Sequence, residues 1–230
     1  MKEAINLIDQ NLEELKGHYI CVSNVHTTVL SYEDPAYKNV QNSAYIRLPD
    51  GKPLSFLSSL KGFREAERVT GPDLMEELFK LSEKKGYTHF FYGSTEQTLQ
   101  LLKKNLQKRY PQMKIVGMYS PPFRPLTVQE DEKIINLINN LKPDFIWVGL
   151  GAPKQEYWMY EHKGRVPSLM IGVGAGFDYH AGKLKRAPLW MQKAGLEWLY
   201  RLVQEPRRLW KRYMLYNTKF LYYLLLRDKG

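Results

Sequence analysis

Short apolar segments alternate with longer segments of helical periodicity along most of this chain, and this alternation limits the possible folds more than any other feature. The expected strands span residues 19–23, 44–48, 88–92, 114–118, 144–148 and 168–171. The expected helices span residues 3–16, 26–42, 71–85, 95–109, 127–141 and 154–163, with a break in the second near Asp34. Strands joined by helices of this length form βαβ units, so we expect an α/β fold with a parallel sheet covered by helices on both faces.

Residues suited to ligand binding follow the ends of these expected strands. They are Asn24, Asp50, Gly93, Ser94, the segment 149–156 and the segment 174–178. In an open parallel sheet, ligands bind in the crevice outside the carboxyl ends of the strands. The sequence therefore predicts one site along this edge, built from residues that lie far apart in the chain.

The Pro49-Asp50-Gly51 turn has two interpretations. A carboxylate held rigidly at a strand end suits a general base or a metal ligand. Asp-Gly pairs also occur in many turns for the sake of the backbone alone, and composition by itself favours this second interpretation. The surroundings of Asp50 must decide between them.

The segment GLGAPKQE at residues 149–156 is a stronger candidate for a phosphate site. Its glycines, Gly151 among them, let the backbone approach a ligand, and the helix that begins there presents free amide groups. Lys154 adds a positive charge, while Gln155 and Glu156 offer specific hydrogen bonds. The alternative is an ordinary turn between a strand and a helix, since the spacing is neither a Walker loop nor the dinucleotide fingerprint.

The sequence shows no signal for a metal or a cofactor. The segment GVGAG at residues 172–176 lacks the third glycine of the dinucleotide fingerprint, so we expect no NAD. None of the 5 histidines has metal-ligand spacing. The single cysteine, Cys21, lies in an apolar run and is expected to be an inert, buried thiol.

Charge divides the chain near Lys183. The formal net charge is +10, of which residues 183–230 hold +9 (12 Lys or Arg against 3 Asp or Glu) and residues 1–182 hold +1 (22 against 21). The basic segment also carries many Trp, Tyr and Phe rings, a mixture that suits the interface of an anionic membrane. The same mixture suits single-stranded nucleic acid. A third interpretation is a helix packed on the domain with a solvated basic face.

Two long patterns resemble those of one protein family. They are GLGAPKQE and the stretch GVGAGFDYHAGKLKRAPLWMQKAGLEWLYRLVQEPRRLWKRY, which begins at Gly172. Both resemble the WecG/TagA/CpsF glycosyltransferases, glycosyltransferase family twenty-six. The segment VTGPDLMEELFKLSEKKGYTHFFYGS and the surroundings of Asn24 and Asp50 extend the resemblance over most of the chain.

The resemblance implies a Rossmann-like α/β fold with a basic, aromatic C-terminal helical appendage. It also implies an inverting, metal-independent enzyme without a cofactor, which moves a hexose or N-acetylhexosamine from a UDP-sugar to a saccharide on a polyprenyl diphosphate. Such products enter capsule, exopolysaccharide or teichoic acid. The enzyme is then expected as a peripheral protein on an anionic membrane surface, at the cytoplasmic face of the cell membrane, and self-association is suggested.

This interpretation divides the chain into a glycosyltransferase domain at residues 1–195 and a membrane-associating tail at residues 196–230. It expects no nucleic-acid partner. The alternative is a nucleic-acid-binding α/β module that uses the same basic, aromatic tail.

The resemblance also implies roles for single residues. Asp50 matches the proposed general base, and Asn24 matches an asparagine near the sugar site. Gln155 is expected to contact the donor or the acceptor. Val22 stands where many members have threonine, so a glucose donor is as plausible as an N-acetylmannosamine donor.

The remaining implied contacts are with phosphates. Gly174 and Asp178 match the loop on the nucleotide side of the site. Arg186, Arg207 and Arg208 are expected to face diphosphate groups. In a metal-free enzyme, such cations stabilise the leaving UDP.

Overall fold

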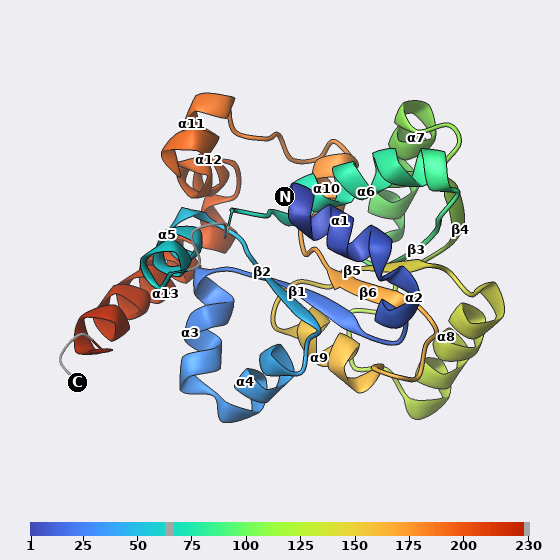
Figure 1. The fold of residues 1–230 in the computed structure, drawn as a ribbon, viewed down its shortest axis with the longest axis horizontal. Coiled ribbons are helices and arrows are strands. Elements are labelled where there is room, and N and C mark those ends of the chain that lie inside the picture. The colour runs from blue at the N-terminus through green and yellow to red at the C-terminus, as the bar shows by residue number, and fades with distance from the viewer. Residues whose placement is uncertain (63–66, 228–230) are drawn as a thin grey trace.

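The computed structural model describes residues 1–62 and 67–227 and contains a six-stranded parallel sheet (Figure 1). The strands are β1 (Tyr19–Ser23), β2 (Ile46–Pro49), β3 (Thr88–Gly93), β4 (Lys114–Tyr119), β5 (Phe145–Gly149) and β6 (Leu169–Gly172). Their order is β2-β1-β6-β5-β3-β4, and every neighbouring pair is parallel. The expected α/β fold with six strands is thereby confirmed.

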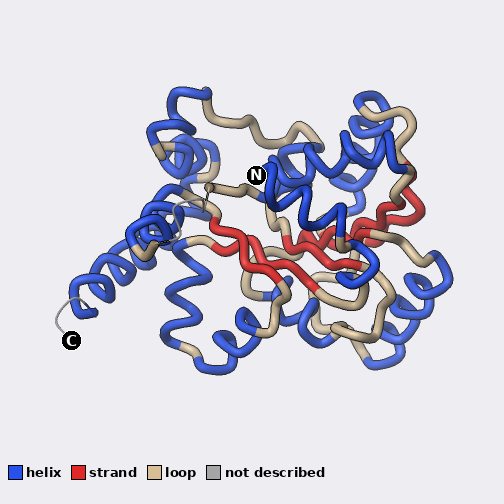
Figure 2. The backbone as a smooth tube through the Cα atoms, in the orientation of Figure 1, coloured by secondary structure: helices blue, strands red, loops and turns tan. Residues whose placement is uncertain are grey.

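Helices cover both faces of the sheet, which is seen edge-on between them in Figure 2. One face carries α1 (Lys2–Gln10), α2 (Leu12–Leu15), α6 (Gly71–Lys85), α7 (Glu96–Arg109) and α10 (Gly176–His180). The other face carries α3 (Val25–Glu33), α4 (Pro35–Asn42), α8 (Val128–Leu141) and α9 (Lys154–Glu161). Four further helices gather beyond one end of the sheet: α5 (Lys52–Leu60), α11 (Leu189–Ala194), α12 (Glu197–Gln204) and α13 (Pro206–Arg227).

The centre of the sheet is rigid because aromatic rings fill it. Trp147 of β5 is fully buried, and its Nε1 donates a hydrogen bond of 3.0 Å to Nδ1 of His89 on β3. The His89 ring stacks on both Trp147 and Phe145. Burial lowers the pKa of His89 to about 3, so this histidine is a neutral part of the core.

The helices differ from expectation in two places and agree with it in a third. The expected helix 3–16 breaks at Asn11 into α1 and α2. The break near Asp34 is confirmed, since the Asp34 carboxylate caps α4 by accepting a bond of 2.9 Å from the Ala36 amide. Helix α5 was not expected. Leu54, Leu57 and Leu60 recur at helical spacing in it, but it buries none of its residues.

Helix α13 lies along α3 at the end of the sheet where β1 and β2 terminate (Figure 1). The rings of His26 and Tyr216 meet at 4.3 Å, and Glu33 pairs with Lys219 at 2.7 Å and accepts a hydrogen bond from Tyr223. Through these contacts, α13 covers the carboxyl ends of β1 and β2. A separate finding concerns membranes: among the residues that the structure describes, no helix is both long enough and apolar enough to cross one.

Candidate active site

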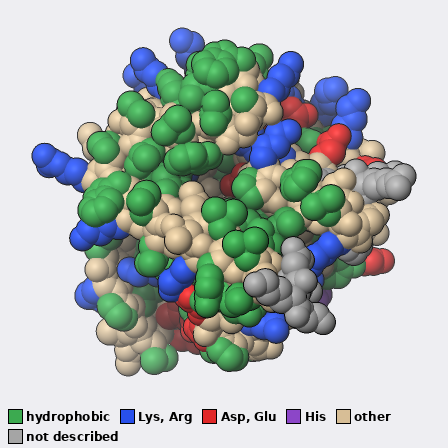
Figure 3. Space-filling model, turned by 90° about the vertical axis from the view of Figure 1, so that its left-hand side faces the viewer, with side chains coloured by type: hydrophobic (Ala, Val, Ile, Leu, Met, Phe, Trp, Pro, Cys, Tyr) green, Lys and Arg blue, Asp and Glu red, His purple; other side chains and the backbone are tan. Residues whose placement is uncertain are grey.

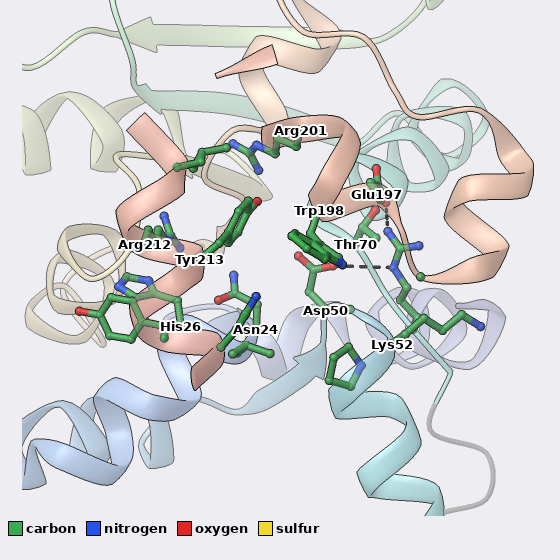
Figure 4. A pocket seen from close by; sticks show the side chains of 18 of the residues that line it. Asn24, His26, Asp50, Lys52, Thr70, Glu197, Trp198, Arg201, Arg212 and Tyr213 are labelled. Atoms are coloured by element: carbon green, nitrogen blue, oxygen red, sulfur yellow. Dashed lines mark hydrogen bonds and ion pairs between the residues drawn. The ribbon is translucent and has the colours of Figure 1, made fainter. Parts of the chain in front are cut away.

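A cavity of about 400 Å³, here called the inner cavity, lies at the carboxyl ends of β1 and β2 (Figure 4). Its walls come from the two strand ends, the loop before α6, and helices α12 and α13. Of the described residues that line it, five are Lys or Arg and two are acidic: Lys52, Arg68, Arg186, Arg201 and Arg212 against Asp50 and Glu197. This excess of positive charge suits an anionic ligand such as a diphosphate.

Asp50 lies at the end of β2 with its carboxylate in the inner cavity. Its backbone amide donates a bond of 2.7 Å to the Ser23 carbonyl, so the neighbouring strand holds the turn. Its side chain is 30% exposed, and Oδ1 lies 3.9 Å from Nε of Arg68. Burial raises the pKa of Asp50 to about 6, the charge of Arg68 opposes that rise, and the charge of Glu197 adds to it. A carboxylate with this pKa is a better proton acceptor than a solvated one and is still largely ionised at neutral pH.

Glu197 of α12 joins the C-terminal segment to the body of the protein. It forms ion pairs with Arg68 and, at 3.2 Å, with Arg186. Arg186 also pairs with Asp73 at 3.0 Å, and all four residues form the cluster that we call the Glu197 cluster. Arg186, which was expected to face a diphosphate, lines the cavity. Its positive charge is already paired with Asp73 and Glu197. The cluster therefore both holds α12 and sets the charge around Asp50.

The opposite wall of the cavity carries Asn24 and His26 (Figure 4). Asn24 caps α3. Its side-chain oxygen accepts a hydrogen bond of 3.3 Å from the backbone amide of Thr27, and Thr27 Oγ1 accepts one of 2.8 Å from the backbone amide of Asn24. This reciprocal capping holds Asn24 at the cavity wall. Burial, together with the nearby charge of Arg212, lowers the pKa of His26 to about 4, so its ring is neutral at physiological pH.

The tail cations in the inner cavity are Arg201 and Arg212. The Arg201 and Arg186 guanidinium groups lie 5.7 Å and 5.5 Å from the centre of the Tyr179 ring. Burial lowers the pKa of Arg212, and its buried Nε hydrogen-bonds no atom among the described residues. A buried, unpaired donor of this kind is costly unless a ligand meets it. We therefore regard Arg212 as a ligand-facing cation.

Arg207 and Arg208, the tail residues expected at the diphosphate, do not line the inner cavity. Both side chains are exposed, and Arg208 pairs with Glu205 at 2.6 Å. Lys154 is likewise exposed and outside the cavity lining. Asp178 is half-buried beyond the lining, and burial raises the pKa of its carboxyl.

Gln155 and Glu156 are buried next to the cavity edge and do not line it. Gln155 Oε1 accepts bonds from the amides of Gly151 at 3.2 Å and Gly174 at 3.0 Å. Gln155 Nε2 donates a bond of 2.8 Å to Glu156 Oε1. The Gln155 amide thus ties the loop after β5 to the loop after β6.

Gly93 and Ser94 also lie at the carboxyl edge, outside the lining of the inner cavity. A Cβ on Gly93 would meet the carbonyl carbon of Gly149 at 2.6 Å, so only glycine allows β3 and β5 to approach this closely. The Ser94 amide donates a bond of 3.2 Å to the Gly149 carbonyl. These residues hold neighbouring strand ends together.

Sequence analysis did not identify Arg68, Glu197, Trp198 and Tyr213 as site residues, although all four line the cavity. Arg68 has no local signal, because it precedes α6 in a loop without a motif. Glu197 has a weak one, as an acid within a strongly basic segment. Its pairing with both Arg68 and Arg186 shows why an acid is needed there.

An open parallel sheet with a carboxylate of raised pKa beside clustered arginines at its carboxyl edge is suited to acid–base chemistry on an anionic ligand. The chain belongs to the family described as "Glycosyl transferase WecG/TagA/CpsF family", whose model matches residues 1–230. It is therefore a glycosyltransferase, and the expected family is confirmed. Family membership favours the enzyme over the alternative of a nucleic-acid-binding module.

The relatives of this chain include named enzymes. The N-acetylglucosaminyldiphosphoundecaprenol N-acetyl-beta-D-mannosaminyltransferase of Bacillus subtilis (strain 168) is 33% identical over 224 residues, which cover 97% of this chain and 83% of the relative. The enzyme of the same name from Bacillus spizizenii is 30% identical over 220 residues, covering 95% and 83%. That of Staphylococcus aureus (strain MW2) is 31% identical over 195 residues, covering 84% and 73%.

Proposed function

We propose that this glycosyltransferase moves a hexose or N-acetylhexosamine from a UDP-sugar to a saccharide on a polyprenyl diphosphate. The product belongs to a bacterial surface polysaccharide such as teichoic acid, capsule or exopolysaccharide. The names of the relatives support a lipid-diphosphate acceptor, since they describe transfer to N-acetylglucosaminyldiphosphoundecaprenol. The cationic lining of the inner cavity supports substrates that carry diphosphates.

The observation that carries the mechanism is the Asp50 carboxylate, which lies in the inner cavity with its pKa raised to about 6. Asp50 takes the proton of the acceptor hydroxyl as the hydroxyl oxygen attacks the anomeric carbon. The bond between that carbon and the diphosphate oxygen breaks, and UDP leaves with the electron pair. A single displacement of this kind inverts the anomeric configuration. Arg201 and Arg212 stabilise the charge that develops on UDP, in place of a metal.

We further propose that the enzyme works as a peripheral protein at the cytoplasmic face of the membrane. Large apolar side chains and basic side chains share the face formed by α5, α11, α12 and α13 (Figure 3). Val203, Met214 and Leu225 are 74%, 67% and 69% exposed, and Trp190 and Trp210 are 64% and 50% exposed. Apolar and aromatic side chains beside cations suit the surface of an anionic bilayer.

The test is turnover of UDP-N-acetylmannosamine, UDP-N-acetylglucosamine and UDP-glucose on a GlcNAc-diphospholipid acceptor, followed by UDP release and product mass. Asp50→Asn should lower turnover by roughly a hundredfold to ten-thousandfold, as expected for loss of a general base. Asp9→Asn, on α1 outside the cavity, is the matched control. Unchanged turnover in Asp50→Asn would remove Asp50 from the mechanism, and strong inhibition by a chelator would contradict metal independence.

A further inference from the structure

A second, open cavity of about 840 Å³ continues from the inner cavity and runs between α5 and α11. We call it the outer groove. It shares five lining residues with the inner cavity: Lys52, Pro53, Arg68, Gly195 and Trp198. It is therefore an opening of the inner cavity to the surroundings, bounded by helices other than α13.

The outer groove is continuous with the base. Asp50 is followed by Gly51, the N-cap of α5, and Lys52 is the first residue of that helix. In Figure 4, Asp50 lies between Lys52 on one side and Tyr213 and Arg212 on the other. Asp50 is therefore accessible both from the Lys52 side, where the outer groove opens, and from the side of Arg212 and Tyr213. An acceptor and a donor can reach it from opposite sides.

The lining of the outer groove is both cationic and apolar. Lys52 and Lys193 are exposed cations, and Arg68, which pairs with Glu197, lies at the inner end. Glu67 is the acid among the described lining residues, and its side chain is 73% exposed and paired with the N-terminal amine. The groove thus retains a positive balance that a diphosphate complements.

Apolar side chains lie among these cations in the wall of the outer groove. Phe56 of α5 is 64% exposed and Trp198 is 43% exposed, and both line the groove. Its narrow inner end is set by Gly195, where a Cβ would meet Lys52 Cγ at 3.0 Å and φ is +76°. A wall that carries both cations and exposed aromatic rings fits a ligand whose diphosphate is joined to a hydrocarbon chain.

We propose that the outer groove between α5 and α11 binds the diphosphate and the first isoprene units of the acceptor lipid. This inference rests on the proposed function, which supplies the chemical class of the acceptor. The saccharide lies at Asp50, the diphosphate lies at Lys52 and Lys193, and the chain leaves over Phe56. The inner cavity, at about 400 Å³, is at the small end for a ligand site, and a long lipid has to leave it through an opening.

The first test uses the full chain and two GlcNAc-diphosphate acceptors, one with a farnesyl chain and one with an octyl chain. Lys193→Gln should raise the KM of both acceptors roughly threefold to tenfold and leave the Kd of UDP unchanged. Phe56→Ser should remove the preference for the farnesyl acceptor. The matched controls are Lys104→Gln on α7 and Phe123→Ser, whose native side chains are exposed outside the groove.

The outcomes separate the two proposals. Absence of turnover by the wild type with every sugar nucleotide overturns the proposed function. If the wild type turns over but Lys193→Gln and Phe56→Ser behave like their control variants, the groove assignment alone is overturned. A weaker affinity of Lys193→Gln for UDP overturns it as well. A benzophenone-bearing farnesyl diphosphate tests the groove without turnover: labelling of residues 52–60 and 193–198 supports it, and labelling confined to α13 overturns it.

Discussion

The Arg68 guanidinium pairs with the Glu197 carboxylate across 129 residues of sequence. Arg68 lies in the loop before α6, beside Asp50, whereas Glu197 begins α12. Each side chain is only 16% exposed, so solvent screens the pair weakly. The charges around Asp50 therefore depend on the position of the C-terminal segment.

Glu197→Gln is expected to move the acidic limb of the pH profile to lower pH. In the wild type, kcat/KM should rise as pH passes about 6, where Asp50 ionises. Removing Glu197 removes a charge that raises the pKa of Asp50 and frees Arg68 to lower it. The limb should shift by about half a pH unit to one unit, measured from kcat/KM against pH. Glu161→Gln on α9 is the control, and an unmoved limb contradicts the coupling.

Asp50→Asn is expected to stabilise the folded protein above pH 6. The folded-state pKa of Asp50 is about 6, above its ordinary value of 3.8, so the native state holds the proton more tightly than the unfolded state. Wild-type stability therefore declines, relative to the variant, as pH rises from about 4 to 6. The free energy of unfolding of the variant should exceed that of the wild type by on the order of 1–3 kcal/mol at pH 7.5 and by almost nothing below pH 4. Thermal unfolding of both proteins across this pH range measures the difference in stability. A difference that does not change with pH contradicts the burial of a charge at Asp50.

Gln155→Ala is expected to lower the free energy of unfolding by about 2 kcal/mol, because it leaves the partly buried backbone amides of Gly151 and Gly174 without their acceptor. Denaturant unfolding measures this loss, with Gln107→Ala on the exposed face of α7 as the control. A variant with native stability but no turnover would instead indicate that Gln155 contacts a substrate directly.

Arg212→Gln is expected to weaken UDP binding about tenfold, since the variant loses a buried cation with an unpaired Nε in the inner cavity. Isothermal titration with UDP measures the Kd. Lys211→Gln, one residue earlier on the exposed side of α13, should bind UDP like the wild type. Equal affinities for both variants would place the nucleotide away from Arg212.

The sheet was predictable because its strands are short apolar runs that become buried between two helical layers. The positions of Asn24 and Asp50 in one cavity followed from the same inference, since parallel strands end at a common edge. By contrast, α5 was not predicted: Leu54, Leu57 and Leu60 recur at helical spacing, but the segment is short and buries no residue.

Side-chain direction and long-range pairing were not predictable. Gln155 lies in the first turn of α9, and nothing in the sequence says that its amide turns inward to join two loops instead of facing the cavity. The tail arginines form one basic group by composition, yet the packing of α13 separates Arg212, in the cavity, from Arg207, in solvent. The pairing of Arg68 with Glu197 depends on the complete tertiary structure.

The walls of the inner cavity come from residues as early as Asn24 and as late as Leu221. During synthesis, the sheet with Asp50 leaves the ribosome well before the helices that enclose it. A nascent chain that has released the sheet therefore holds Asp50 and Arg68 but not Arg201 and Arg212, and on the proposed mechanism catalytic competence arrives only with α13. Errors that truncate translation within α13 should yield folded sheets that do not consume sugar nucleotides.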